Sequence, residues 1–497
     1  MNPTEASTPS LSRRMLKWPG RLLGPALIVI AGLVMGQQYV APNKRVLPIL
    51  IGILITGLAW RVGIVAGLGV LVMTLPYPRG TVFGNTNLAL ILVLLVIWLL
   101  RITQRMSPPP RRTTVDLPIV GLLIMYMLSF NNVRDQTLLI RGVQNLELFL
   151  GAVLMFYLIV NNLQSSKDLE RLHNFMLISA VSVFALAVYE LNHPAAMFIQ
   201  GWIDFSNTVG SEFNTRNVRV GSAFHDYELL SEYCAVTLLL ASFRLLRARS
   251  GTGKLLYGSF LVLNAFVLFT TVTRGAIIAL ALGLIYMLWM VRRHLRFVPF
   301  TIVTVAALTG FLAMNNFVAR FTRSGDMFAR LFQTRVVHGW MPDDRAGSWQ
   351  NAWGRAMVHP LMGSGPSYGD VKGWELWWPH NVYLYYADII GFTGLLFFLW
   401  LLFKLFRLTQ PQTDDLTHPN YAKAAVLVCR AQLVIFTVNE FKIDYLRNNI
   451  YLFPVWAMFA TWTATALIAR RSAAAAPAPV DLPKPASPFP RLRAVGQ

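Results

Sequence analysis

The feature that most constrains this chain is a series of apolar runs, each 14–22 residues long, that recurs from one end to the other. A bilayer core of about 30 Å requires about 20 apolar residues in a helix, and a helix satisfies its own backbone groups inside lipid. Charged residues make up 13% of the chain, against about 25% in soluble domains. The sequence therefore predicts an all-α polytopic membrane protein with 12–14 transmembrane helices.

The apolar runs give fourteen candidate spans. They are 21–40, 47–60, 62–75, 87–100, 117–130, 145–160, 173–190, 227–244, 255–271, 275–291, 297–314, 382–403, 423–440 and 449–469. The second and third are short for a crossing, so they either span the bilayer fully or form a re-entrant pair. Both choices leave the later spans in the same orientation.

Lys and Arg indicate the orientation, because cytoplasmic loops carry an excess of them. The short segments on the side of the N-terminus hold most of the basic residues, which places both termini in the cytoplasm. The end of the chain is rich in Ala and Pro, as disordered tails are. The predicted parts are a cytoplasmic tail (1–20), transmembrane helices (21–314) with an external loop near 191–226, a large external loop with an interfacial helix (315–381), further transmembrane helices (382–469) and a disordered cytoplasmic tail (470–497).

The large external loop contains "DDRAGSWQNAWGRAMVHPLMGSGPSYGD", residues 343–370. Asp343 or Asp344 can cap a helix that ends before the proline of "PLMGSG". Trp349 lies on one apolar face of this helix, as in a helix at the membrane interface. Most of the helix is explained as an interfacial cover, but Arg345 at its start is a candidate for binding an anion.

Three further arginines lie near helix starts on the external side. Arg274, in "TVTRGAIIALALGL", is at the turn between two spans, where it either snorkels to the headgroups or holds a phosphate with its guanidinium fork. Arg216 and Arg219 precede another helix start. The nearby "HDYE" (225–228) offers possible metal ligands, but we expect no metal there because adjacent side chains rarely converge on one ion.

His380 lies at the boundary between the external loop and a span, in "WPHNVYLYYADIIG", residues 378–391. One explanation for His380 is that it simply lies at the end of a helix that is capped by Asn381. A neutral histidine, whose ordinary pKa is about 6.5, also accepts a proton from a hydroxyl group. With several arginines on the same face, this pattern fits a lipid diphosphate attacked by a hydroxyl acceptor.

These motifs ("TRGA" at a span start, "PLMGSG" in the large loop and "HNVYL" at the next span) resemble those of the bacterial O-antigen ligases and O-antigen (polysaccharide) polymerases. The resemblance covers about 215–400, and the earlier part is similar only in hydropathy. It implies a class-C-like, inverting glycosyltransferase without metal or cofactor, on the periplasmic face of the bacterial inner membrane. The donor would be a glycan on undecaprenyl diphosphate, and no nucleic acid would be bound.

The resemblance leaves the acceptor open. A ligase would use lipid A–core, whereas a polymerase would use a second lipid-linked glycan. The family often has an Asn-Pro-Asn-like turn where this chain has "HDYE", and this difference concerns the acceptor side. The sequence therefore does not separate ligase from polymerase.

Roles for individual residues follow from the same motifs. His380 would be the general base on the acceptor hydroxyl. Arg274 and Arg219, with Arg345 assisting, would hold the diphosphate, and Arg216 is added to this set by its position. Asn381 is expected to support His380 by capping its helix.

Two charges lie inside the spans at similar depth. Asp388 follows Asn381 by seven residues, which is about 10 Å, and Arg430 lies about 15 Å deep. An unpaired charge there is costly, so the depths predict a pair between Asp388 and Arg430 that supports the helix carrying His380. The alternative is that Arg430 snorkels or contacts backbone carbonyls elsewhere.

Two other classes of function compete with this hypothesis. A lipid-linked glycan flippase or transporter would need polar groups at the bilayer midplane and two repeated halves, and the sequence has few of the former and no evident repeat. A structural scaffold of the envelope would not need the external arginines.

Overall fold

The computed structural model describes residues 46–77, 86–192, 197–199, 203–204, 219–294, 297–322, 326, 328, 343–366, 379–447 and 449–474. Its helices are α3 Val46–Arg61, α4 Ile64–Thr74, α5 Thr86–Thr103, α6 Asp116–Ser129, α7 Gln136–Asn162, α8 Ser166–Asn192, α9 Tyr227–Arg247, α10 Gly251–Thr270, α11 Arg274–Val291, α12 Phe297–Phe321, α14 Asp343–Val358, α15 Val382–Leu408, α16 Tyr421–Asn439 and α17 Asn449–Ala474. Short 3-10 helices are η1 Phe130–Asn132, η3 Ser222–Phe224, η4 Arg292–His294 and η6 Tyr445–Arg447. Strands β1 Met197–Ile199 and β2 Ile203–Asp204 form a small antiparallel hairpin.

The prediction of an all-α polytopic membrane protein is confirmed. Within the described part of the chain, nine helices are long and apolar enough to cross a membrane, and three shorter apolar helices accompany them. Every expected span from 47 onward corresponds to one helix, while the span 21–40 and the tails 1–20 and 475–497 lie outside the described residues.

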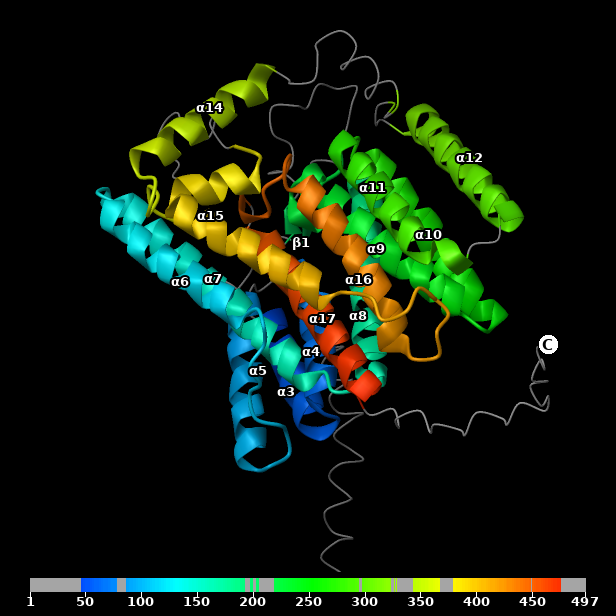
Figure 1. Ribbon diagram of the computed structural model, residues 1–497, viewed down its shortest axis with the longest axis horizontal. Coiled ribbons are helices and arrows are strands. Elements are labelled where there is room, and N and C mark those ends of the chain that lie inside the picture. Colours follow the sequence, from blue (N-terminus) through cyan, green and yellow to red (C-terminus); the bar gives the residue numbers. More distant parts are fainter. Residues whose placement is uncertain are drawn as a thin grey trace, which may run out of the picture.

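The expected short pair is the hairpin of α3 and α4 (Figure 1). Only Val62 and Gly63 separate the two helices, and they pack against each other. The 11 residues of α4 rise about 17 Å, roughly half of a bilayer core of about 30 Å. This length favours the re-entrant alternative for the hairpin.

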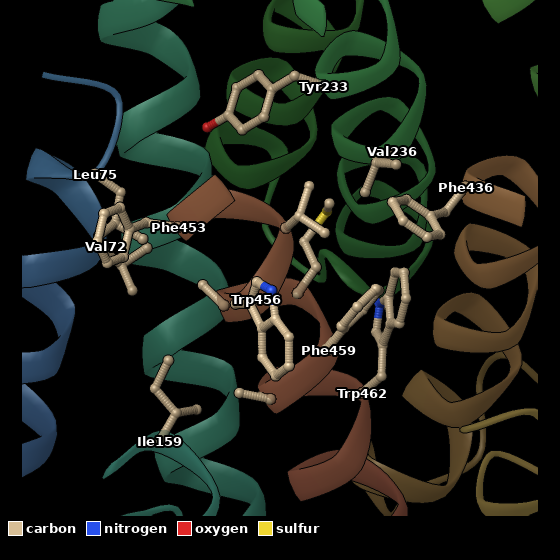
Figure 2. Close-up of a cluster of buried hydrophobic side chains, with 14 of the residues drawn as sticks. Val72, Leu75, Ile159, Tyr233, Val236, Phe436, Phe453, Trp456, Phe459 and Trp462 are labelled. Atoms are coloured by element: carbon tan, nitrogen blue, oxygen red, sulfur yellow. The ribbon is translucent and has the colours of Figure 1, made fainter. Parts of the chain in front are cut away.

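The most deeply buried element is α17, which packs mainly against α7 and α16 and also contacts α15 and α8. Of its apolar window, 94% is buried inside the protein, as expected of a helix that is apolar on all sides. Figure 2 shows its aromatic side chains, Trp456, Phe459 and Trp462, among side chains of neighbouring helices. The rings of Phe459 and Phe436 of α16 meet edge to face, with centroids 5.1 Å apart, a favoured geometry.

The glycine turn after α14 is docked on a kink in α15 (Figure 1). Gly391 interrupts α15 with a φ of 75°. A Cβ at Gly363 would lie 2.3 Å from the carbonyl carbon of Ile389, and one at Gly391 would lie 2.5 Å from that of Leu361. Backbone hydrogen bonds join the segments, including one from Phe392 N to the Pro360 oxygen at 2.7 Å. Glycine is needed at both positions because the two backbones are in direct contact.

Candidate functional site

One end of the bundle, which we call the site end, holds the first turns of α9, α11 and α15 and the last turn of α16 (Figure 1). The amide of Val382 in α15 donates to the carbonyl of Glu440 after α16, at 3.0 Å. At the start of α11, a Cβ on Gly275 would lie 3.4 Å from Asn439 of α16. Three helix N-termini, with their partial positive charge, therefore lie at the same end of the molecule.

Glu228, in the first turn of α9, lies between two of the expected site residues. Its Oε1 is 2.5 Å from Nη2 of Arg345, and its Oε2 is 3.4 Å from Nδ1 of His380. Only 6% of the Glu228 side chain is exposed, against 26% of Arg345 and 30% of His380. The carboxylate is thus buried beneath a cationic and a titratable group that both remain accessible.

The "HDYE" segment forms the start of α9. The carboxylate of Asp226 caps the helix by accepting from the amides of Glu228 and Leu229, at 2.7 and 3.2 Å. Asp226 therefore binds backbone amides, whereas Glu228 contacts Arg345 and His380. Among the described residues, no group of three or more His, Cys, Asp and Glu side chains is placed to hold a metal ion.

His380 is held in an unusual backbone conformation by its neighbours. Its φ is 47°, in the left-handed region that few residues other than glycine adopt. The indole of Trp349 in α14 donates to the carbonyl of Pro379 at 2.8 Å. Asn381 caps α15 by accepting from the amides of Tyr383 and Leu384 at 3.0 and 3.1 Å. Such conformations persist only where surrounding contacts fix them, and they concentrate at functional sites.

Arg219 holds the turn between α10 and α11. Its guanidinium donates to the carbonyls of Thr271 and Val272 at 3.0 and 3.3 Å and lies 3.2 Å from the ring centroid of Tyr227. Val272 has a φ of 48°, which is strained for a β-branched residue. This turn leads directly into Arg274, so Arg219 helps to place that residue.

The remaining expected arginines lie in different settings. Arg274 is the first residue of α11 and is half-buried. Besides Glu228, Arg345 binds the carbonyl of Lys442, at 3.1 Å, which ties the loop helix α14 to the segment after α16. Arg216 lies outside the described residues. The structure thus brings Arg219, Arg345 and His380 to one end, with Arg274 at the neighbouring helix start.

On the sequence alone, Glu228 was considered only as a possible metal ligand, and three other buried carboxylates were not singled out: Glu232, Glu440 and Asp444. Glu232 accepts from Asn439 at 2.7 Å and from Tyr451 at 3.1 Å. Burial and the nearby carboxylate of Glu232 raise the pKa of Glu440 well above its usual range. A sequence signal existed, because acidic residues in or beside membrane spans are rare and usually functional.

The predicted pair of Asp388 and Arg430 is wrong. Asp388 pairs with Arg355 of α14, whose Nη2 and Nε lie 2.6 and 2.8 Å from its Oδ2. The hydroxyl of Ser364 in the glycine turn also donates to it, at 3.2 Å. Asp388 therefore fixes α14 and the glycine turn to α15, which begins two residues after His380.

Arg430 lies in a different part of the bundle. Its Nε donates to the hydroxyl of Tyr286 in α11 at 2.7 Å, and its guanidinium lies 4.4 Å from the ring centroid of Phe406. The prediction failed because the two helices have different main neighbours in the bundle. Helix α15 packs mainly against α6 and α14, whereas α16 packs mainly against α11, α17 and α9. A similar expected depth therefore did not make the two charges neighbours.

Comparison with known proteins shows which family part of the chain resembles. No curated protein matched the chain. Residues 259–399 match the family model described as O-antigen ligase. The matched segment includes Arg274, Arg345, Arg355, His380 and Asp388, but not Arg219 or Glu228. Over residues 259–399 the chain is therefore similar to the O-antigen ligase family.

Proposed function

We propose that this protein transfers a glycan from undecaprenyl diphosphate to an acceptor hydroxyl, with inversion at the anomeric carbon and without a metal ion. The observation that carries the proposal is the arrangement of His380 beside Glu228, with Arg345 on the same carboxylate. Together with the family match at residues 259–399, it supplies a base, a group that orients the base, and positive charge at one end of a membrane bundle.

His380 acts as the base. A carboxylate that faces Nδ1 favours the tautomer with the proton on Nδ1, which leaves Nε2 to accept a proton. As the acceptor oxygen attacks the anomeric carbon, its proton passes to Nε2 of His380. The imidazolium that forms is stabilised by Glu228, whose Oε2 lies 3.4 Å from Nδ1.

The diphosphate leaves from the opposite face of the sugar, taking the electrons of the broken carbon–oxygen bond. Arg274 is its main ligand, because this guanidinium lies at the N-terminus of α11, where amide groups and the helix dipole also favour an anion. Arg219 positions this start through the preceding turn, and Arg345 balances Glu228. Positive charge placed in advance around the leaving group lowers the barrier.

We further propose that the site end faces the periplasm of a bacterial inner membrane and that both termini are cytoplasmic. The excess of Lys and Arg in the short segments at the opposite end supports this orientation. The acceptor is then lipid A–core or a second lipid-linked glycan, both of which carry sugar hydroxyls on that side.

The test is transfer of a labelled glycan from undecaprenyl diphosphate by the purified full-length protein, with and without lipid A–core. His380→Ala and Arg274→Ala should each lower the rate by about 10²–10⁴-fold. His418→Ala and Arg293→Ala are controls away from the site end, and both should keep the rate of the parent protein. Near-normal transfer by both site variants would refute the assignment. Label on lipid A–core identifies a ligase, and longer lipid-linked chains identify a polymerase.

A further inference from the structure

A groove of about 460 Å³ lies between α15 and α16, in a region where these helices make few contacts with each other. Its walls are mainly apolar, with Leu402, Phe403 and Phe406 from α15 and Val434 and Val438 from α16. The volume is in the range of roughly 300–1,000 Å³ that is typical of small-molecule sites. Since both helices are membrane spans and Phe403 is 54% exposed, the groove opens toward lipid.

Two arginines give this groove a charged end. Arg430 belongs to the middle of α16, but its guanidinium lies 4.4 Å from the ring of Phe406, in the last turn of α15. The side chain thus extends toward the membrane boundary, as snorkelling arginines do. Arg407, exposed in that same last turn, also lines the groove. Within the described residues, neither guanidinium forms an ion pair with a carboxylate.

We propose that the groove binds an anionic phospholipid of the surrounding membrane. The phosphate would lie on Arg407 and Arg430, and one acyl chain would lie along the apolar wall toward Val438. Guanidinium groups bind phosphate through charge-assisted hydrogen bonds, and basic pockets between transmembrane helices take anionic headgroups. Gln410, also in the lining, can donate to a headgroup oxygen.

The charged end of the groove is separate from the candidate catalytic site. Arg430 contacts Tyr286 of α11, and Tyr286 follows Arg274 by 12 residues in that helix, which corresponds to roughly 18 Å. The diphosphate at the site end and the phosphate in the groove therefore belong to different ligands. The inference does not depend on the proposed function, because it needs only a membrane-spanning chain.

The experiment is a titration of the purified, delipidated full-length protein in detergent, followed by native mass spectrometry. The probes are phosphatidylglycerol and phosphatidylethanolamine with identical acyl chains. Phosphatidylglycerol should bind at least about tenfold more tightly, and Arg430→Gln and Arg407→Gln should each weaken it by about tenfold. Lys404→Gln removes a charge from the same helix but outside the groove lining, so it should leave the affinity unchanged.

Several outcomes would overturn the inference. Equal affinity for the two lipids, unchanged binding in both arginine variants, or an equal loss in Lys404→Gln would each do so. If Arg430→Gln fails to fold, Arg407→Gln decides, because Arg407 is exposed at the helix end. Tighter binding of undecaprenyl phosphate than of phosphatidylglycerol, lost in the same variants, would assign the groove to the isoprenoid carrier instead.

Discussion

At the scale of single residues, Glu228 is the buried group around which the candidate site is arranged. A carboxylate removed from water costs several kcal/mol unless a partner compensates it. Arg345 supplies that partner at 2.5 Å, and His380 lies on the other carboxylate oxygen. One charged group thus connects the loop helix α14, the start of α9 and the entrance to α15.

Glu228→Gln should slow glycan transfer by about 10–100-fold while leaving expression intact. The amide no longer favours the imidazolium that forms on His380, so the acid limb of the pH–rate profile should also move to lower pH. Glu170→Gln is a matched control, because Glu170 likewise pairs with an arginine, Arg244 at 2.6 Å, in a pair that the proposal does not use. An unchanged pH profile in Glu228→Gln would show that the carboxylate has only a structural role.

Asp388 and Arg355 should be energetically coupled, whereas Asp388 and Arg430 should not. Asp388→Asn and Arg355→Gln should each lower thermal stability, and the double variant should cost less than the sum, with a coupling of about 1–3 kcal/mol. The reason is that Arg355 contacts Asp388 at 2.6 Å, while Arg430 contacts Tyr286 and Phe406. A cycle of Asp388→Asn with Arg430→Gln is the control, and equal coupling in both cycles would contradict the ion pair.

At the scale of elements, α14, the glycine turn and the kinked start of α15 form one unit. Backbone hydrogen bonds link the turn to α15, with Ser364 N donating to the Asp388 oxygen at 2.7 Å and Gly365 N to the Ile389 oxygen at 3.1 Å. Trp349 of α14 then holds the residue before His380. The orientation of His380, the proposed base, therefore depends on the packing of the glycine turn against Asp388 and Ile389, more than one helical turn further along the chain.

Gly363→Ala and Gly391→Ala should each destabilise the protein by about 1–3 kcal/mol and reduce transfer. Both glycines have a φ of 75°, and an added Cβ would meet backbone atoms of the opposing segment at 2.3–2.5 Å. Gly354→Ala in α14 is the control: its Cβ would meet nothing within 4 Å, and alanine is the better helix former by about 1 kcal/mol. Thermal unfolding in detergent measures all three, and equal stability of the three variants would contradict the close approach.

At the scale of the whole molecule, the buried helix α17 and the many apolar spans form a scaffold that leaves the charged chemistry at the site end and in the α15–α16 groove. At the site end, the carboxylate of Glu228 pairs with Arg345. In the α15–α16 groove, Arg430 lies beside Tyr286, 12 residues after the start of α11. Positive charge is thus present both at the site end and in the groove.

Glycan transfer should be independent of divalent metal ions. In the proposed mechanism arginines balance the diphosphate, and the carboxylate nearest to the base is already paired with Arg345. Excess EDTA should leave the transfer rate within about twofold of the untreated protein, and added Mg²⁺ or Mn²⁺ should not raise it. Loss of activity with chelator and its recovery with metal would contradict this mechanism.

The sequence by itself determined the membrane class, the positions of the helices and several of their ends. Apolar runs specify spans because lipid excludes unpaired backbone groups, and the cap at Asn381 follows from local hydrogen bonding. The helix α14 begins at Asp343, one of the two positions at which the sequence predicts a helix start. The same local pattern placed Arg274 at the start of α11. These features depend on a few neighbouring residues, so they can be predicted without knowledge of the fold.

Only the tertiary structure decided which side chains meet. Glu228 lies next to His380 across 152 positions of sequence, and Asp388 pairs with Arg355 instead of Arg430, for which the sequence predicts a similar depth. Hydropathy gives the depth of a residue in the membrane, but the direction in which its side chain points depends on how all helices pack together. That packing is a property of the whole bundle, and it determines both the site around Glu228 and the groove beside Arg430.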